Sequence, residues 1–275
     1  MRFVKYNALG NDYIVPDSPG VELTEEQIHR ICNRNFGVGA DGILCWSEGI
    51  KGSFKLRIFN PDGSEAEKSG NGIRIFARYL WEKADKKRTR FCIITAGGTV
   101  DAEVNKDGSS VTVDMGQVSF QSDKIPVAGV SREVINEKME IDGQLLTYCA
   151  ATIGNPHCVV VCEQISEDLA RRLGPVIERD SRFPNRTNVQ FMKVVDRNNI
   201  KIEIWERGAG YTLSSGSSSC AAAATAYRLG LCDSNITVQM RGGKISVVVG
   251  KDYSVRMMGP VAKVFEGAIS KEIFD

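Results

Sequence analysis

Several short segments of this chain have the two-residue apolar period of a β-strand. In 55–59, 110–114 and 201–205, apolar side chains alternate with polar ones, as expected of a strand with one buried face. The segment 158–162 is apolar throughout. Helical patterns are fewer, so the chain predicts a mixed structure with more strand than helix.

Two segments predict helices from their capping residues. Residues 24–27 form a capping box ahead of an apolar face, which predicts a helix that begins there. Ser166 precedes a second helix, with Leu169 and Leu173 on one face. We expect Gly174-Pro175 to end this helix, because proline cannot continue the backbone hydrogen bonds of a helix.

Two further helices are predicted to begin at loops of small residues. Ser69-Gly70-Asn71-Gly72 runs into the segment 73–80, and Ser215-Gly216-Ser217-Ser218 runs into the segment 220–224. The second helix is small and apolar on all sides, so it should be fully buried.

Four sequence landmarks occur twice, in the same order. They are Gly10-Asn11-Asp12 and Gly154-Asn155-Pro156-His157; Arg57-Ile58-Phe59-Asn60 and Glu203-Ile204-Trp205-Glu206; Thr95-Ala96-Gly97-Gly98 and Met240-Arg241-Gly242-Gly243; Val113-Asp114-Met115-Gly116 and Arg256-Met257-Met258-Gly259. The spacing is similar as well, since Gly10 precedes Ser69 by nearly the distance at which Gly154 precedes Ser215. The repetition predicts two homologous domains.

The domain boundary is expected near 117–125, a mostly polar stretch. The predicted N-terminal half is 1–118, completed by the C-terminal segment 262–275, and the predicted C-terminal half is 119–261. The fold class is α/β (α+β), with two pseudo-symmetric domains. In each, an antiparallel, barrel-like sheet surrounds one central helix, and the active site is expected in the cleft between the domains.

Composition narrows the possible function. The formal net charge is +1 and the chain has no run of five basic residues, so the features of a nucleic-acid-binding protein are absent. No apolar stretch is long enough to span a bilayer, and the N-terminal residues resemble a buried strand rather than a signal peptide. We expect a cytoplasmic protein that binds neither nucleic acid nor membrane.

The eight cysteines are interpreted as reduced core residues, because most have apolar neighbours. No C-x-x-C pair is present, and the chain has only two histidines, His29 and His157. We therefore expect no metal site.

Both loops of small residues are candidate anion sites. A helix N-terminus offers backbone N–H groups without intrahelical partners and a partial positive charge. Each loop alone is equally well explained as an ordinary helix cap. The occurrence of one loop in each predicted domain favours a shared carboxylate site.

The motifs as a set resemble those of diaminopimelate epimerases, in family order and over nearly the whole chain. The matching segments are Gly10-Asn11-Asp12, Phe36-Gly37-Val38-Gly39-Ala40-Asp41-Gly42, Asn60-Pro61-Asp62-Gly63-Ser64, Gly70-Asn71-Gly72, Gly154-Asn155-Pro156-His157, Thr187-Asn188 and Glu206-Arg207-Gly208-Ala209-Gly210. The resemblance implies a cofactor-independent isomerase that converts LL- to meso-diaminopimelate by a two-base mechanism, in lysine and cell-wall precursor biosynthesis. It also implies a homodimer.

The resemblance assigns roles to individual residues. Two thiols at positions 69 and 215 would serve as base and acid on opposite faces of the α-carbon. The helix starts Gly70-Asn71 and Gly216-Ser217 would hold the reacting carboxylate. Other roles follow by position: Asn11 and Glu206 near the reacting amine and the catalytic pair, His157 beside the acid/base residues, and Asn60, Asn155, Asn188 and Arg207 at the distal amino-carboxylate end.

The chain departs from the family at the centre of this chemistry, since serine occupies both positions 69 and 215. A hydroxyl is far less acidic than a thiol, whose ordinary pKa is about 8.5. We expect little turnover from this form. Three explanations stay open: deliberate Cys→Ser substitution, a natural pseudoenzyme that retains ligand binding, and natural epimerisation by other groups.

A further departure lies at Tyr211, where the family usually has glutamate; the change is expected to alter pocket shape or substrate range. Ser218 and Ser219 replace glycine and alanine, which is a mild change at a helix start. Three other functions remain as alternatives: a related amino-acid racemase, a phenazine-type isomerase with a carboxylate base, and a non-catalytic amino-acid-binding protein.

Overall fold

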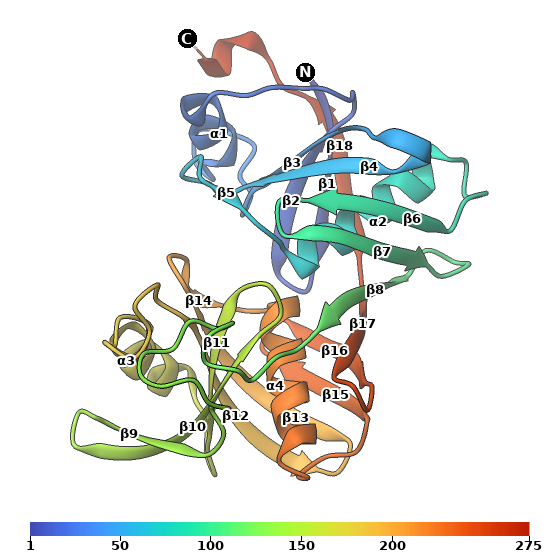
Figure 1. The fold of residues 1–275 in the computed structure, drawn as a ribbon. Helices are drawn as coiled ribbons and strands as arrows, with labels where there is room; N and C mark the ends of the chain where they lie inside the picture. Colours follow the sequence, from blue (N-terminus) through green and yellow to red (C-terminus); the bar gives the residue numbers. More distant parts are fainter. Residues whose placement is uncertain (275) are drawn as a thin grey trace. The chain divides into compact units, whose positions relative to one another are not determined.

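The computed structural model describes residues 1–274 and divides into two compact units (Figure 1). Unit 1 contains Met1–Asp114 and Met258–Asp275, and unit 2 contains Met115–Met257. Its elements in unit 1 are β1 (Arg2–Ala8), β2 (Asn11–Pro16), α1 (Glu25–Cys32), β3 (Ile43–Glu48), η1 (Ile50–Gly52), β4 (Phe54–Phe59), β5 (Glu65–Ala66), α2 (Gly70–Lys83), β6 (Arg90–Thr95), β7 (Gly98–Val104), β8 (Ser110–Gln117, which runs past the boundary), β18 (Ala262–Ala268) and η2 (Lys271–Phe274).

Unit 2 has a closely similar series of elements. They are β9 (Glu137–Ile141), β10 (Gln144–Thr152), β11 (Pro156–Val161), α3 (Glu167–Glu178), β12 (Asn188–Asp196), β13 (Asn199–Glu206), β14 (Gly210–Thr212), α4 (Gly216–Arg228), β15 (Asn235–Met240), β16 (Gly243–Val249) and β17 (Ser254–Pro260, which also crosses the boundary).

Strand pairing follows the same scheme in both units. In unit 1, β1–β2, β3–β4, β4–β5 and β6–β7 are antiparallel, whereas β2–β3 and β4–β6 are parallel. In unit 2, β10–β11, β12–β13, β13–β14 and β15–β16 are antiparallel, whereas β11–β12 and β13–β15 are parallel. The predicted mixed α/β class is confirmed. The sheets are mainly antiparallel, as expected, but each also contains two parallel pairs because a helix or a long loop joins the strands concerned.

Each unit is organised around one buried helix. Residues 70–77 of α2 are all buried, and α2 contacts β1, β2, β6 and β7. Residues 216–226 of α4 are all buried, and α4 contacts six strands of its own unit, β10 to β13, β15 and β16. The predicted burial of the small apolar helix is confirmed.

The two peripheral helices test the capping predictions. Thr24 caps α1 through a complete capping box with Gln27, as predicted. Ser166 caps α3, also as predicted, but the expected end of this helix at Gly174-Pro175 is wrong, since α3 continues to Glu178 with Pro175 inside it. Continuation brings Ile177 into the core of unit 2.

Gly174 has a different role from the one expected. A Cβ atom at this position would lie 2.6 Å from Trp205 Cβ, so the absence of a side chain lets α3 pack closely against β13. Burial of apolar surface thus outweighs the hydrogen bond that Pro175 cannot donate.

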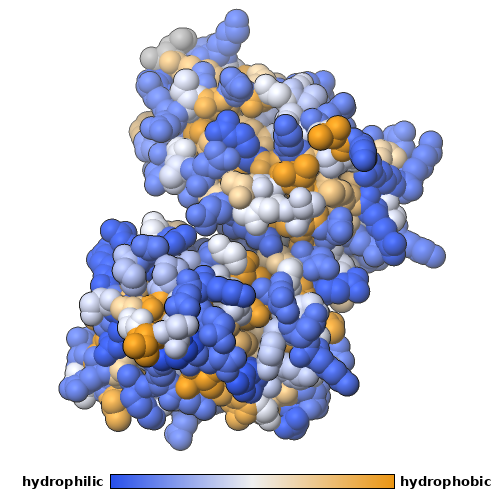
Figure 2. Space-filling model, in the orientation of Figure 1, coloured by the Kyte–Doolittle hydropathy of each residue, from blue (hydrophilic) through white to orange (hydrophobic). Residues whose placement is uncertain are grey.

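The surface is mainly hydrophilic on the face shown in Figure 2, with scattered apolar side chains. Within residues 1–274, no helix is long and apolar enough to cross a membrane.

Candidate functional site

Ser69 is the N-cap of α2, the central helix of unit 1. Its Oγ accepts a hydrogen bond from the backbone N–H of Gly72 at 3.1 Å, and it lies 3.3 Å from the hydroxyl of Tyr13. The following residues Gly70, Asn71 and Gly72 are buried. The first turn of α2 therefore presents its backbone N–H groups beside a half-buried hydroxyl.

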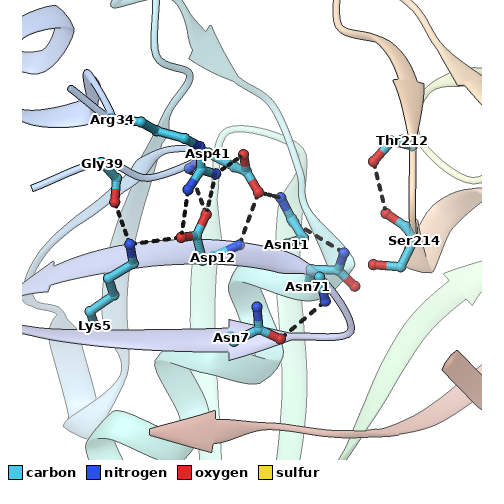
Figure 3. Close-up of polar contacts among 11 residues, drawn as sticks. Lys5, Asn7, Asn11, Asp12, Arg34, Gly39, Asp41, Asn71, Thr212 and Ser214 are labelled. Atoms are coloured by element: carbon cyan, nitrogen blue, oxygen red, sulfur yellow. Dashed lines mark hydrogen bonds and ion pairs between the residues drawn. The ribbon is translucent and has the colours of Figure 1, made fainter. Parts of the chain in front are cut away.

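Two asparagines of the predicted site are bonded to each other in unit 1. Asn71 Nδ2 donates to Asn11 Oδ1 at 3.0 Å, and Asn11 Nδ2 donates to Asp41 Oδ2 at 3.1 Å (Figure 3). Arg74, one turn further along α2, is fully buried and donates to Asn71 Oδ1 at 2.8 Å. The start of α2 and the start of β2 are thus joined by side-chain amides.

A group of alternating charges supports the start of β2. Asp12 pairs with Lys5 at 2.8 Å and with Arg34 at 2.8 Å, and Arg34 also pairs with Asp41 at 2.7 Å (Figure 3). Burial alone would raise the pKa of Asp12, but hydrogen bonds from Arg34 and Lys5 outweigh burial and lower this pKa to about 2. Asp12 is therefore ionised at all ordinary pH values.

Asn60, the remaining predicted site residue of unit 1, lies in the turn between β4 and β5. Its side chain donates to Ser64 Oγ at 3.0 Å, and its backbone N–H donates to the Ser64 carbonyl at 2.8 Å. These contacts hold Asn60 within its own turn, apart from the amide contact between Asn11 and Asn71.

Ser215 caps α4 in the same way as Ser69 caps α2. Its Oγ accepts from the backbone N–H of Ser218 at 3.3 Å and lies 3.5 Å from Ser217 Oγ. Ser219 Oγ donates back to the Ser215 carbonyl at 2.7 Å. Gly216 and these serines are all buried, so the first turn of α4 is built from small side chains only.

His157 is buried, and Gln190 connects it to the start of α4. One ring nitrogen is 3.0 Å from Asn155 Oδ1, the other is 3.1 Å from Gln190 Nε2, and Gln190 Nε2 also donates to Ser218 Oγ at 3.0 Å. Complete burial lowers the pKa of His157 to about 3. The imidazole is therefore uncharged near neutral pH, and it can support Ser218 and Asn155 without acting as a cationic acid.

The remaining candidates of unit 2 surround the end of β13. Asn188 Nδ2 donates to the Pro156 carbonyl at 2.8 Å, and Asn188 Oδ1 accepts from the backbone N–H of Arg207 at 3.0 Å. Asn188 therefore joins the loop that carries Asn155 to the loop that carries Glu206 and Arg207.

Glu178, which fixes the loop that carries Arg207, was not among the residues predicted from the sequence. Glu178 is buried at the end of α3, where Oε2 accepts from the indole of Trp205 at 2.8 Å and Oε1 accepts from the Gly208 N–H at 3.1 Å. Asp41 and Gln190 were missed as well. Asp41 stands inside one of the quoted motifs, but nothing in one sequence assigns a partner to a motif residue.

Tyr211 is held by contacts within unit 2 that the family's glutamate could not make. Its hydroxyl donates to Glu203 Oε2 at 2.7 Å, and the guanidinium of Arg171 lies 4.5 Å from its ring centroid. Burial and the bond to Glu203 raise the pKa of Tyr211. The side chain is thus tied to β13 and α3, and these contacts give no support to the expected effect on substrate range.

None of the eight cysteines forms a disulfide, and burial alters several of their thiols. It raises the pKa of Cys32 to about 12 and the pKa values of Cys45 and Cys162 to about 11, so these three are not thiolates at neutral pH. Among residues 1–274, no group of three or more His, Cys, Asp and Glu side chains is placed to hold a metal ion.

Solved structures with similar folds include enzymes of amino-acid inversion. A hydroxyproline epimerase from Agrobacterium vitis superposes with a TM-score of 0.70 at 16% identity, covering 100% of this chain and 92% of that one. A phenazine biosynthesis protein from Bacillus anthracis superposes with a TM-score of 0.68 at 17% identity, covering 98% and 99%. At this level of identity the likeness shows the fold alone.

Sequence comparison is more specific. The family model described as diaminopimelate epimerase matches residues 3–121 and 149–264. Diaminopimelate epimerase 2 of Nostoc sp. is 57% identical over 277 residues, covering 100% of this chain and 97% of that protein. Diaminopimelate epimerase of Caldanaerobacter subterraneus is 39% identical over 273 residues, covering 98% and 99%. The chain therefore belongs to the diaminopimelate epimerase family.

Proposed function

We propose that this chain binds diaminopimelate at the starts of α2 and α4, and that Ser69 and Ser215 stand where a two-base epimerase of this family carries its base and its acid. The observation that supports this most strongly is their equivalence, since each serine is the N-cap of the central helix of its unit. Inversion at carbon needs one group that removes a proton and a second that delivers one to the opposite face. Two equivalent positions on duplicated units suit that requirement.

The proposed carboxylate site consists of backbone N–H groups. Gly70 and Asn71 begin α2, and Gly216 and Ser217 begin α4. Removal of an α-proton without a pyridoxal cofactor places further negative charge on the carboxylate, and helix N-termini stabilise such charge. No cofactor is needed in this proposal.

The proposed distal site consists of amides and one arginine. Asn60, Asn155, Asn188 and Arg207 would recognise the second amino-carboxylate end of the substrate, where the planar guanidinium can meet a carboxylate with two hydrogen bonds. The bond between Asn188 and the Arg207 N–H supports their placement at one site. Asn11 and Glu206 would lie near the reacting amine.

Serine at these positions should bind ligand but hardly invert it. In both units the hydroxyl oxygen already accepts a hydrogen bond from its own helix, so each serine acts as a helix cap. Cysteine at the same N-caps would have its thiolate stabilised by the helix N-terminus. The second candidate function, a non-catalytic amino-acid-binding protein, is favoured by the same two serines. We place either form in the cytoplasm, as a homodimer, with the active form serving lysine and cell-wall precursor synthesis.

The test is exchange of the substrate α-proton in deuterated water. General acid–base groups contribute about 10²- to 10⁴-fold each, so the serine protein should exchange the α-proton of LL-diaminopimelate more than about 10⁴-fold slower than the Ser69→Cys, Ser215→Cys double variant. Each single variant serves as the matched control and should form little meso-diaminopimelate, because one thiol can exchange the proton on its own face but cannot deliver a proton to the other. Exchange by the unmodified chain as fast as by the double variant would contradict the two-thiol mechanism. Binding without any gain of exchange in the double variant would support the non-catalytic alternative.

A further inference from the structure

We propose that Asp41 and Arg74 are positioning residues that fix which way the side-chain amides of Asn71 and Asn11 point. In this direction the Asn11 oxygen is available to accept a hydrogen bond from the substrate ammonium group. The direction of the amides follows from contacts within unit 1. Its consequence for the substrate rests on the proposed function.

The direction follows from what each end of the chain of hydrogen bonds can do. Arg74 is a donor only, so its contact with Asn71 at 2.8 Å requires the asparagine oxygen at that end. The NH₂ group of Asn71 then faces Asn11, whose oxygen accepts it at 3.0 Å. Asp41, as a carboxylate, accepts only, and it receives the Asn11 NH₂ group at 3.1 Å.

Both ends of this hydrogen-bond chain are themselves held firmly. Arg74 is fully buried on α2, and its neighbour Asn71 is buried as well. Asp41 Oδ2 also accepts the backbone N–H of Asp12 at 3.0 Å, while Asp41 Oδ1 pairs with Arg34. The carboxylate therefore cannot turn away from Asn11 without loss of two further interactions.

The direction matters because the oxygen of a side-chain amide accepts hydrogen bonds whereas its NH₂ group donates them. An amide oxygen has two lone pairs, and only one on Asn11 is used by Asn71. An ammonium group can only donate, so it is stabilised by this oxygen and opposed by an NH₂ group in its place. A turn of Asn11 by 180° would thus replace a favourable contact with an unfavourable one.

The test reverses the hydrogen-bond chain at one end and then at the other. Asn71→Asp keeps the contact with Arg74 but cannot donate to Asn11, so Asn11 must turn and its oxygen then faces Asp41. Asp41→Asn supplies a donor at the other end. We expect Asn71→Asp to weaken binding of LL-diaminopimelate by the serine protein at least about tenfold in calorimetry, since a hydrogen bond to a charged group is lost. Addition of Asp41→Asn supplies the donor that the turned Asn11 oxygen needs, so it should restore thermal stability lost in Asn71→Asp but leave the affinity low.

The matched control is Asp107→Asn, which changes a fully exposed aspartate of the same unit. It should leave the affinity unchanged alone and give no gain of thermal stability with Asn71→Asp. If Asn71→Asp binds as tightly as the parent, or if Asp41→Asn returns the affinity of Asn71→Asp to the parent value, the proposal is overturned. Thermal unfolding of each variant identifies any general loss of structure.

A second readout does not need the substrate. The Asn11 side-chain NH₂ signal, followed by amide hydrogen exchange in nuclear magnetic resonance, should exchange about tenfold faster in Asp41→Ala than in the parent, because its acceptor is gone. Unchanged exchange would overturn the role of Asp41. If the parent binds no diaminopimelate while Asp41→Ala still accelerates exchange, the proposed function fails and the positioning of the amides stands.

Discussion

The central helices α2 and α4 occupy the same place in two units of the same strand pairing, yet they are made of different side chains. Counted from the capping serine, the seventh residue is Phe76 in α2 and Ala222 in α4, and both are fully buried. In α2 the ring of Phe76 lies 5.9 Å from that of Trp46 and 6.2 Å from those of Phe54 and Tyr79. In α4 a run of alanines lies at the equivalent positions.

The difference shows that strand pairing is compatible with two solutions of the packing problem. Large rings fill the space around α2, whereas small side chains allow the strands to approach α4 closely. The polar first turns differ as well, because the charged Arg74 donates to Asn71 whereas the uncharged Gln190 donates to Ser218. The N-cap serine is the feature that both helices share.

The largest expected effect comes from a substitution that disrupts the packing around α2. Phe76→Ala gives α2 the residue that α4 has at this position, but the aromatic neighbours remain in place and a cavity is left. We expect the free energy of unfolding to fall by about 3 to 5 kcal/mol. Urea denaturation followed by intrinsic tryptophan fluorescence measures it; a loss below about 1 kcal/mol would show that unit 1 can contract around a smaller helix.

A smaller effect concerns the first turn of α4, where His157 should make the free energy of unfolding depend on pH. His157 has a folded pKa near 3, below its ordinary value of about 6.5, so the unfolded state takes up a proton first as the pH falls. Stability contributed by neutral His157 is complete above about pH 6.5 and declines between pH 6.5 and 3. From pH 6.5 to 4.5 the loss should be about 2 kcal/mol.

The control for this pH effect is the other histidine. His157→Gln should flatten the pH dependence of the urea midpoint between pH 6.5 and 4.5, because glutamine does not titrate. His29→Gln, at an exposed position of α1, should leave it unchanged. An unaltered slope in His157→Gln would assign the acid sensitivity to other groups.

The smallest expected effect concerns the N-cap serine, the feature that α2 and α4 share. Ser69→Ala and Ser215→Ala each remove an N-cap acceptor, and each should lower the free energy of unfolding by about 1 kcal/mol. Thermal denaturation of the two variants measures the loss. A negligible loss at either serine would show that its hydroxyl is not needed as a cap.

The sequence was sufficient for the fold class and for the caps, because these depend on periodicity and on residues a few positions apart. The capping serines, the buried helix of alanines and the capping box at Thr24 are local patterns. The contact between Asn11 and Asp41 joins residues 30 positions apart, and that between Gln190 and Ser218 joins residues 28 apart. Periodicity carries no information on such pairings, so the groups that support the candidate site emerged only from the structure.

The helix-breaking role assigned to Pro175 failed for a related reason. Propensity describes an isolated helix, whereas α3 is held by Leu173 and Ile177 in the core of unit 2. The close approach of Trp205 to Gly174 is a tertiary contact that no window of sequence could reveal.

The pairing of β18 with β1 places strands from both extremes of the chain side by side in unit 1 (Figure 1). On the ribosome, residues 115–257 of unit 2 emerge as one uninterrupted stretch before β18 exists. Domains usually mature in the order of their synthesis, but here the second unit can be completed first. Until β18 has been added, β1 carries an unpaired edge on the nascent protein, and such an edge is a template for aggregation.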